Sequence, residues 1–420
     1  MAGGLMQLVA YGAQDVYLTG NPEVTFYQAK YKRHTNFAME NIEQTVNGTA
    51  ANSGRVSVTV ARNGDLVGDM YLELESSIAT TATAEAGDCN WVAERAISSV
   101  ELSIGGQRID KHYQKWWRLY SELYLDEAKK ATWGKMTTAA DTGAGTGTVY
   151  LPLVFFFNRN PGLYLPLIAL QYHEVRIDID LASDFNEFLN VSVFKVWANY
   201  VYLDTEERRR FAQKGHEYLI EQVQHTGSDA MAAAGSTKQI RLSYNHPVKE
   251  LIFCADQGSV SRANLWNFTS STQVVTTDAG DQLAASTSSV VPTSLSGAPQ
   301  LQVAKAVAPW TEEADGPIET FKLVLNGQDR FKEQDGKYFN AVQPYQHHSG
   351  SPMPGVYAYS FALKPEEHQP TGTCNFSRID NAQVAIKTKA AATALNLNMF
   401  AVNYNVLRIQ SGMGGLAFSN

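Results

Sequence analysis

Three short motifs occur twice in this chain, in the same order, and this repetition limits the folds that the chain can adopt. The paired segments are residues 42–44 (Ile-Glu-Gln) with 220–222, residues 105–107 with 326–328, and residues 199–200 (Asn-Tyr) with 403–404. Each lies beside sequence typical of β-strands, and the separation within a pair changes along the chain. A duplicated all-β domain with unequal loop insertions would have these properties. Enzymes rarely need two copies of one all-β unit, whereas the building blocks of shells and lattices often do.

The length agrees with a duplication. A chain of 420 residues exceeds what one hydrophobic core usually supports, so we expect two domains of about 200 residues each. We place an N-terminal arm at residues 1–24, the first domain at 25–213 and the second at 214–420. Hydrophobic residues make up 44% of the chain and charged residues 18%, which indicates that each domain buries a sizeable core.

Charge and cysteine content argue against several kinds of protein. The net charge of −8 disfavours direct nucleic-acid binding, which rests largely on Lys and Arg. Cys89, Cys254 and Cys374 form no CxxC pair, so the sequence indicates neither a disulfide framework nor a zinc site, and a reducing compartment of synthesis fits best. Residues 1–13 lack the basic residues of a secretory signal, and the longest apolar stretch, 151–157, is far shorter than the roughly 20 residues of a membrane span. We expect a soluble chain.

Several segments have the composition and periodicity of strands. Residues 55–61 and 66–75 are rich in β-branched and apolar residues, and Asn63-Gly64 between them predicts a hairpin with a tight turn. Residues 175–181 alternate strictly between apolar and charged side chains. Further strands are expected at 151–157, 191–203 and 395–409. Many strands with long irregular connections favour sandwiches or jelly rolls over βαβ units.

We expect few helices. Apolar and aromatic residues recur at helical spacing from Lys111 to about Lys129, which predicts one clear helix. Its aromatic side chains, among them Trp116 and Trp117, are expected to pack the helix onto a sheet, because a stripe at this spacing is usually core and not an aromatic binding site.

The connections also have distinct compositions. Segment 204–215 is the expected junction of the domains, where alternating acids and bases predict a short helix with a solvated face and Asp204 with Glu207 resembles a capping box. Residues 126–149 and 256–318 are rich in small residues and are expected to be loop insertions with functional, outward-facing surfaces.

No complete catalytic or metal-binding motif occurs in the sequence. His173-Glu174 and His216-Glu217 begin like HExxH zinc helices but lack the second histidine. The glycines of segment 143–147 are not followed by the Lys-Ser or Lys-Thr of a phosphate-binding loop. His347 and His348 are adjacent, which favours a solvated loop over a metal site, since neighbouring imidazoles on extended chain diverge.

Three pairs of carboxylates are candidates for a hydrolase site: Asp178 with Asp180, Glu312 with Glu313, and Glu366 with Glu367. A glycosidase needs two carboxylates across a cleft, one of them in an apolar setting, and the sequence gives no sign of such a pairing. We therefore expect no enzyme activity, no catalytic residue, no metal site and no cofactor.

Four asparagines match the N-x-[ST] glycosylation motif: Asn47, Asn190, Asn267 and Asn375. Asn267 lies inside the long second insertion and is the one candidate glycosylation site that we expect to be exposed.

Segments along nearly the whole chain resemble the major capsid proteins of large icosahedral DNA viruses of the algal-virus type. The matching segments are residues 3–15, 17–22, 35–38, 105–113, 165–175, 245–247, 325–331, 374–380, 403–408 and 412–416. The departures lie in the two insertions and in a short loop at 387–394, so glycan positions are not carried over from the family.

This resemblance implies an all-β fold of two tandem eight-stranded antiparallel jelly-roll sandwiches with long loop insertions and few short helices. It further implies a homotrimer, a pseudo-hexagonal capsomer that tiles an icosahedral virion shell beside neighbouring capsomers and minor capsid proteins, with an internal membrane beneath. Such a protein is made and assembled in the host cytoplasm and has no catalytic role.

Two N-terminal features fit a shell protein. Residues 1–13 are apolar and uncharged, and they are expected either to pack against a neighbouring subunit or minor protein or to form a first strand on their own domain. Lys30, Lys32, Arg33 and His34 form a basic cluster that we expect to face the interior, toward an anionic membrane or acidic scaffold.

One alternative comes from another class. A jelly-roll carbohydrate-binding or surface-attachment protein would carry exposed aromatic residues on loop tips, and Trp133, Trp266 and Trp310 lie in the insertions.

Overall fold

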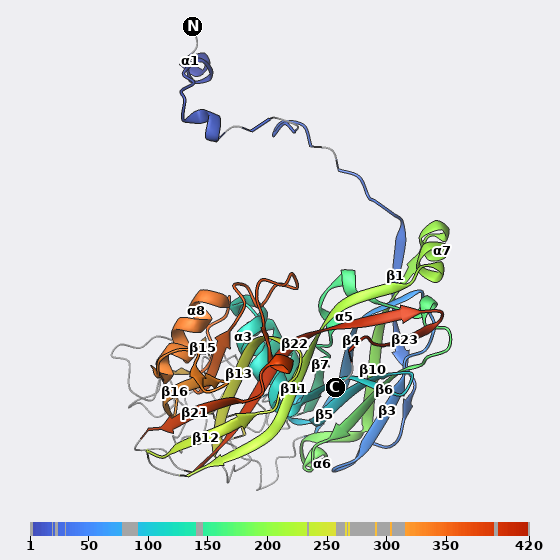
Figure 1. Ribbon diagram of the computed structural model, residues 1–420. Coiled ribbons are helices and arrows are strands. Elements are labelled where there is room, and N and C mark those ends of the chain that lie inside the picture. The colour runs from blue at the N-terminus through green and yellow to red at the C-terminus, as the bar shows by residue number, and fades with distance from the viewer. Residues whose placement is uncertain are drawn as a thin grey trace. The chain divides into compact units, whose positions relative to one another are not determined.

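The computed structural model describes most of the chain (Figure 1). The described residues are 3–18, 20–21, 24–29, 31–77, 91–139, 146–232, 235–257, 265–266, 268, 290–291, 303–304, 316–389 and 394–418. The chain divides into two units, Met1–Phe37 and Ala38–Asn420. Among the described residues, no helix has both the length and the apolar character needed to cross a membrane.

The N-terminal unit has little regular structure. It contains helix α1 (Gly3–Val9) and the 3-10 turn η1 (Asp15–Tyr17), and none of its described residues is buried. Apolar side chains such as Leu8 and Val9 therefore have no core within the unit itself. A helix this short is marginal in water unless another surface covers it.

The first sandwich consists of two sheets. The strands of one sheet, in spatial order, are β1 (Phe37–Gln44), β10 (Leu189–Leu203), β4 (Leu66–Ser77) and β7 (Thr146–Pro152), with the short β8 (Leu165–Pro166) also paired to β4. The strands of the other are β2 (Val46–Asn47), β3 (Arg55–Thr59), β9 (Val175–Leu181), β5 (Ile97–Ile104) and β6 (Gln107–Tyr113). The predicted alternation is confirmed in β9, where Val175, Ile177, Ile179 and Leu181 are all buried.

The second sandwich repeats this arrangement. One sheet has the order β11 (His216–Met231), β22 (Leu395–Gln410), β13 (Pro247–Gln257) and β19 (Val356–Ser360), with β20 (Cys374–Asn375) on β13 and β23 (Met413–Leu416) on β22. The other has β12 (Thr237–Leu242), β21 (Ala382–Thr388), β16 (Ile318–Leu325) and β17 (Gln328–Asp329), with β18 (Gln334–Asp335) on β16. A separate pair joins β14 (Val290–Val291) to β15 (Val303–Ala304).

The two sandwiches have the same topology. The order β1-β10-β4-β7 corresponds to β11-β22-β13-β19, and β3-β9-β5-β6 corresponds to β12-β21-β16-β17. Each sandwich thus has eight principal strands, and the chain crosses repeatedly from one sheet to the other, as in a jelly roll. The expected fold class is confirmed: the protein is all-β, with two tandem jelly rolls and few short helices.

All three repeated motifs lie on equivalent elements. Ile-Glu-Gln ends β1 and lies in β11, and Asn-Tyr lies in β10 and in β22. The third motif forms the β5–β6 and β16–β17 turns, whose central residues all have positive φ: Gly105 (58°), Gly106 (82°), Asn326 (51°) and Gly327 (80°). Two successive positive φ values define the tight turn whose twist matches that of the flanking strands, so Gly and Asn are the residues expected there.

The helices are short and lie between strands. They are α2 (Val92–Arg95), α3 (Gln114–Tyr124), α4 (Glu127–Thr137), α5 (Phe156–Arg159), α6 (Phe185–Phe188), α7 (Thr205–Gln213) and α8 (Gln343–His347). Further single turns are η2 (Pro161–Leu163), η3 (Leu167–Ala169), the π-helical η6 (Tyr338–Val342) and η7 (Phe376–Arg378). Helix α7 occupies the expected junction and has no buried residue, but Asp204 makes no side-chain cap bond, so the capping box is not formed.

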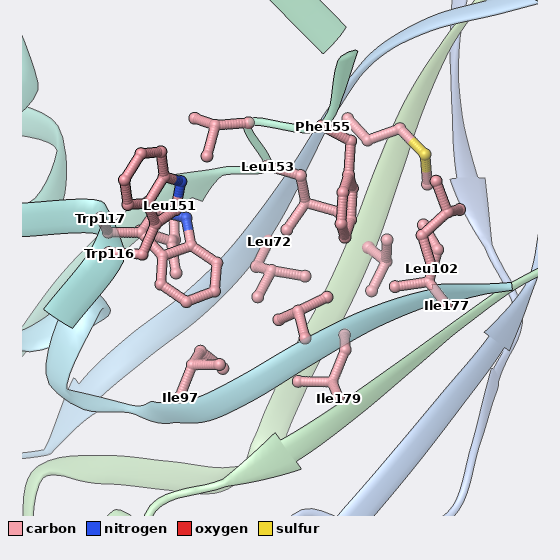
Figure 2. Packing of buried hydrophobic residues seen from close by; sticks show 14 of the residues in the cluster. Leu72, Ile97, Leu102, Trp116, Trp117, Leu151, Leu153, Phe155, Ile177 and Ile179 are labelled. Atoms are coloured by element: carbon pink, nitrogen blue, oxygen red, sulfur yellow. The ribbon is translucent and has the colours of Figure 1, made fainter. Parts of the chain in front are cut away.

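Two hydrophobic clusters make up the core. The first fills the first sandwich, where Trp116 and Trp117 of α3 lie beside side chains of both sheets (Figure 2). It continues past α3 to β22 of the second sandwich, with the rings of Trp116 and Phe400 5.8 Å apart. The second cluster lies between the sheets of the second sandwich. The prediction that the aromatic stripe is core is confirmed.

The sheet of β11, β22, β13 and β19 is therefore buried on both faces. Along β22, Phe400 and Val402 belong to the first cluster, whereas Met399 and Ala401 belong to the second. Residues 397–405 of β22 are all buried as a result, and this part of the strand lacks the alternation of a half-exposed one.

The predicted hairpin between residues 55–61 and 66–75 is wrong. Both strands exist, but β3 pairs with β2 and β9, whereas β4 pairs with β10, β7 and β8 in the other sheet. Asn63-Gly64 is part of a crossing between sheets, and a Cβ on Gly64 would lie 2.8 Å from that of Tyr200. Glycine is required there by close packing and not by a positive φ.

The single helix predicted from Lys111 to about Lys129 is also wrong in its bounds. Residues 111–113 end strand β6, and α3 is followed by a second helix, α4. Helix α4 occupies much of segment 126–149, where we expected a loop. Asp126 accepts a hydrogen bond from the backbone N–H of Lys129 at 2.7 Å and so caps α4. Segment 256–318 lies mostly outside the described residues.

Candidate functional site

Two of the candidate hydrolase carboxylates, Asp178 and Asp180, have structural partners. Asp178 on β9 is neutralised by Arg55 Nη2 at 3.3 Å and Arg176 Nη2 at 2.8 Å. Asp180 accepts a hydrogen bond from the hydroxyl of Ser99 at 2.9 Å. These ion pairs hold the carboxylates against a strand surface, where they have no apolar pocket of the kind that a general acid needs.

The other two pairs give no catalytic arrangement either. Glu366 accepts hydrogen bonds from the backbone N–H and hydroxyl of Ser349, at 2.8 and 3.0 Å, and Glu367 pairs with Lys364 at 2.8 Å. Glu312 and Glu313 lie outside the described residues.

The histidines of the incomplete zinc motifs bind backbone atoms. His173 Nδ1 lies 2.8 Å from the carbonyl oxygen of Gly414, and His216 Nε2 lies 2.7 Å from that of Phe211. Within the described ranges, no group of three His, Cys, Asp or Glu side chains is placed to hold a metal ion. Segment 143–147 is described only from residue 146, where β7 begins.

Of the three tryptophans expected on the insertions, Trp133 and Trp266 are buried. Trp133 donates its indole N–H to Glu94 at 2.6 Å. Trp310 lies outside the described residues.

The glycosylation motifs lie in different surroundings. The candidate Asn267 lies outside the described residues. Asn47 on β2 is exposed. Asn190 donates to Glu75 at 2.8 Å, and Asn375 accepts from the backbone N–H of Ser377 at 3.0 Å.

Buried charges instead gather where the two sandwiches meet. Arg159 of α5 donates to Glu221 of β11 at 2.9 Å, and Lys249 of β13 reaches the other oxygen of that carboxylate at 2.6 Å. We call these three residues the Glu221 cluster. Burial alone would raise the pKa of Glu221, but the two cations outweigh it and hold that pKa well below its usual range. The carboxylate is therefore charged and links the two sandwiches.

A second group, the His348 cluster, lies nearby. His348 contacts Glu250 through Nε2 and Glu366 through Nδ1, the latter at 3.4 Å, and Glu250 also accepts a hydrogen bond from the hydroxyl of Tyr124 at 2.8 Å. Burial opposes the charged imidazolium, but the two carboxylates raise the pKa of His348 to about 9. The expectation of a solvated loop at His347 and His348 is wrong for His348, whose side chain is fully buried.

A third contact joins helices α3 and α4 to residues 350–353 of the second sandwich, and we call it the α3–α4 contact. Lys130 Nζ donates to the carbonyl oxygen of Ser351 at 2.6 Å, and Glu122 accepts from the backbone N–H of Met353 at 3.2 Å. Gly350 packs so closely that a Cβ there would lie 2.6 Å from the carbonyl oxygen of Leu125. The three contacts make the two sandwiches one block.

Sequence reasoning missed these buried charges. Lys, Glu and His are usually exposed, and the sequence around Glu221, Lys249 and His348 gives no signal of burial. Only the pairing of distant segments brings them together.

Three apolar side chains in and near α8 are exposed among the described residues of the second sandwich. We call Val342, Tyr345 and Leu363 the α8 patch; Tyr345 is 88% and Leu363 73% exposed in a single chain. His347 Nδ1 lies 3.0 Å from the carbonyl oxygen of Leu363 and so holds the 363 loop beside α8. Apolar side chains gathered in this way are typical of a protein–protein contact.

Two family models match the chain. Residues 25–204 match the major capsid protein N-terminus, and residues 207–415 match the large eukaryotic DNA virus major capsid protein. The chain is 43% identical to the major capsid protein of Paramecium bursaria Chlorella virus 1 and 42% identical to that of Pyramimonas orientalis virus, each over 100% of both chains.

Solved structures agree with the fold. The chain superposes on the capsid protein of the PBCV-1 virus capsid model with a TM-score of 0.78 and 37% identity, covering 94% of this chain and 100% of that one. The Faustovirus major capsid protein shares the fold at a TM-score of 0.71 with 12% identity, over 97% of this chain and 96% of that one.

Proposed function

Since this chain belongs to the family of large eukaryotic DNA virus major capsid proteins, we propose that three copies of it associate into one pseudo-hexagonal capsomer. The protein is a structural component of the virion capsid. The homotrimer, its inner partners and its place of assembly are the parts that we propose.

The observation that carries the proposal is the fusion of two sandwiches of identical strand order into one block. The Glu221 cluster, the Tyr124–Glu250 hydrogen bond of the His348 cluster and the α3–α4 contact hold the sandwiches together. Three such blocks around a three-fold axis place six similar walls at the rim. A nearly hexagonal outline follows, which lets capsomers tile a face against their neighbours.

The α8 patch supports a contact between copies. Burying Val342, Tyr345 and Leu363 against a neighbouring chain would remove a large apolar area from water. Obligate assemblies bury on the order of 2,000 Å² or more per contact, and exposed apolar side chains of this size are typical of their interfaces.

Light scattering after size exclusion tests the proposal. We expect a particle with the mass of three 46.2 kDa chains, and pseudo-hexagonal outlines in negative-stain images. A stable particle with the mass of one chain at micromolar concentration would overturn the homotrimer.

We further propose that the N-terminal arm and its basic residues meet inner partners. Lys32, Arg33 and His34 would face minor capsid proteins or the anionic surface of an internal membrane, because charge of opposite sign attracts them. Charge reversal by Lys30→Glu with Lys32→Glu should then impair particle assembly while trimers still form. Unchanged assembly would contradict this part of the proposal.

We assign the protein no enzymatic role, no cofactor and no direct contact with nucleic acid, in keeping with its net charge of −8. The carbohydrate-binding alternative receives no support from Trp133 and Trp266, because both are buried and a sugar-stacking ring must be exposed. Binding on a glycan array by the assembled capsomer would revive it.

The division into residues 1–24, 25–213 and 214–420 stays a proposal, as does assembly in the host cytoplasm. Cys254 and Cys374 are free thiols, which supports synthesis in a reducing compartment such as the cytoplasm.

A further inference from the structure

A buried polar group where the sandwiches meet differs from the ion pairs described above, because it contains an asparagine amide beside a lysine and a carboxylate. Lys115 of α3 contacts Asp256 of β13 through its Nζ, and Asn398 of β22 donates its Nδ2 to the same carboxylate oxygen at 2.8 Å. Asp256 and Asn398 are almost fully buried, and the Lys115 side chain is about one-fifth exposed. One carboxylate oxygen therefore lies between an amine and a carboxamide.

The fold fixes these three residues independently of one another. Cys254 pairs with Asn398 in the β13–β22 register, and Asp256 is two residues beyond Cys254, so all three side chains point to the same face of the sheet. Cys254 and Phe400 on that face belong to the first hydrophobic cluster, which also contains Trp116 of α3. The sheet thus presents Asp256 and Asn398 to the helix that carries Lys115.

Burial shifts Lys115 toward the neutral, nucleophilic form of its amine. Burial lowers the pKa of Lys115, since an ammonium ion loses hydration in the apolar core. A desolvated amine is the form of lysine that attacks carbonyl carbon. The side-chain amide of Asn398 is the neighbouring electrophile, because its Nδ2 and the lysine Nζ both contact the same oxygen of Asp256.

We propose that Lys115 and Asn398 become joined by an isopeptide bond, with Asp256 as the proton relay. The neutral Nζ attacks the side-chain amide carbon of Asn398 and forms a tetrahedral adduct. Asp256 accepts a proton from Nζ and delivers it to Nδ2, which leaves as ammonia. One N–C bond forms, one breaks, Asp256 is regenerated, and neither an oxidant nor a cofactor is required.

The other buried lysines lack one of the components. Lys249 pairs with Glu221, and Lys130 binds Glu122, Glu127 and the carbonyl oxygen of Ser351. No asparagine side chain is among these described partners, so neither lysine has an amide to attack. They serve as internal controls.

Such a bond would be a covalent link between the two sandwiches. It would join α3 of the first to the last long strand of the second and close a loop of most of the chain, which reduces the entropy of the unfolded state. The inference concerns a single chain and stands whether or not the capsomer is a trimer.

Mass spectrometry of the full chain purified from assembled particles tests the proposal without any substitution. We expect an intact mass lower than the sequence mass by one ammonia. Tryptic digestion should yield residues 112–118, uncleaved after Lys115, joined to residues 390–408. Separate peptides of unmodified mass would overturn the proposal, and so would a loss of one water with Asp256 in the cross-link.

Two controls separate the bond from other causes of ammonia loss. Asn-Gly pairs at 47–48, 63–64 and 326–327 can cyclise with the same mass change, but they produce no joined peptides. Asn398→Ala and Asp256→Asn should restore the full mass, whereas Lys135→Met, at an exposed residue of α4, should leave the joined peptides in place. Joined peptides that persist in Asn398→Ala would refute the assignment.

Discussion

Arg159 and Glu221 come from different sandwiches, yet the guanidinium Nη2 lies 2.9 Å from the buried carboxylate of Glu221. Lys249, with no exposed surface, holds the other oxygen of the same carboxylate. Removing either cation would leave the almost fully buried carboxylate of Glu221 with one partner too few. The stability of both sandwiches therefore depends on the ion pair between Arg159 and Glu221, which joins them.

We predict that Arg159→Met destabilises the protein by about 3 kcal/mol or more, as is usual when one partner of a buried ion pair is removed. Urea unfolding measures this change. Arg408→Ala is the matched control, because Arg408 and Glu217 are also 2.9 Å apart but both are largely exposed, and its effect should stay below about 1 kcal/mol. Equal effects of the two substitutions would contradict the role given to Glu221.

Stability should also fall at alkaline pH because of His348. Its pKa is raised from 6.5 to about 9 in the folded protein. The stabilisation is then fully present below the unfolded value and is lost as pH rises through about 9, because the folded state gives up its extra proton. Thermal melting between pH 6 and 10 should show this decline, and His348→Gln should flatten it. A decline of the same size in His348→Gln would assign it to other groups.

Gly350→Ala should destabilise the protein, on the order of 1–3 kcal/mol, because its Cβ would lie 2.6 Å from the backbone oxygen of Leu125 and 2.8 Å from that of Glu122. Backbone atoms in this contact cannot move aside as a flexible side chain could. Gly147→Ala on β7 is the control, since a Cβ there meets nothing within 4 Å. Thermal midpoints of both variants measure the difference, and an unchanged midpoint in Gly350→Ala would show that the α3–α4 contact is loose.

Leu363→Asp should weaken the proposed association of copies while leaving the fold of each chain intact. A charge in the α8 patch opposes its burial against a neighbour, whereas a single chain exposes Leu363 already. Light scattering across a concentration series should show a shift toward the mass of one chain. Lys364→Ala changes the adjacent, exposed residue and should not shift it. A full-size particle in Leu363→Asp would place the contact elsewhere.

The sequence predicts where most strands lie but does not predict which strands pair with one another. The period of two in β9 and the paired motifs on β1 and β11 could be predicted, because both depend on local composition. The hairpin at Asn63-Gly64 could not, because a turn signal says nothing about which sheet each flanking strand joins. Pairing between distant segments decides that, and a single sequence carries little of it.

The two copies of the Ile-Glu-Gln motif show why the sequence could not predict the Glu221 cluster. Glu43 and Glu221 occupy the same position of the Ile-Glu-Gln motif, but Glu43 is exposed on β1 and Glu221 is buried on β11. The difference arises because the sheet of β11 is covered on both faces. No property of the motif distinguishes the two copies, so the Glu221 cluster could be found only from the structure.

That doubly covered sheet also makes the second sandwich depend on the first. The face of this sheet that turns away from the core of the second sandwich packs against the first sandwich, and β22 contributes apolar side chains to both hydrophobic clusters. If the second half were expressed alone, it would present this wall to water and would aggregate. The second sandwich therefore cannot lose the first and stay folded, whereas the loops can vary in length and sequence.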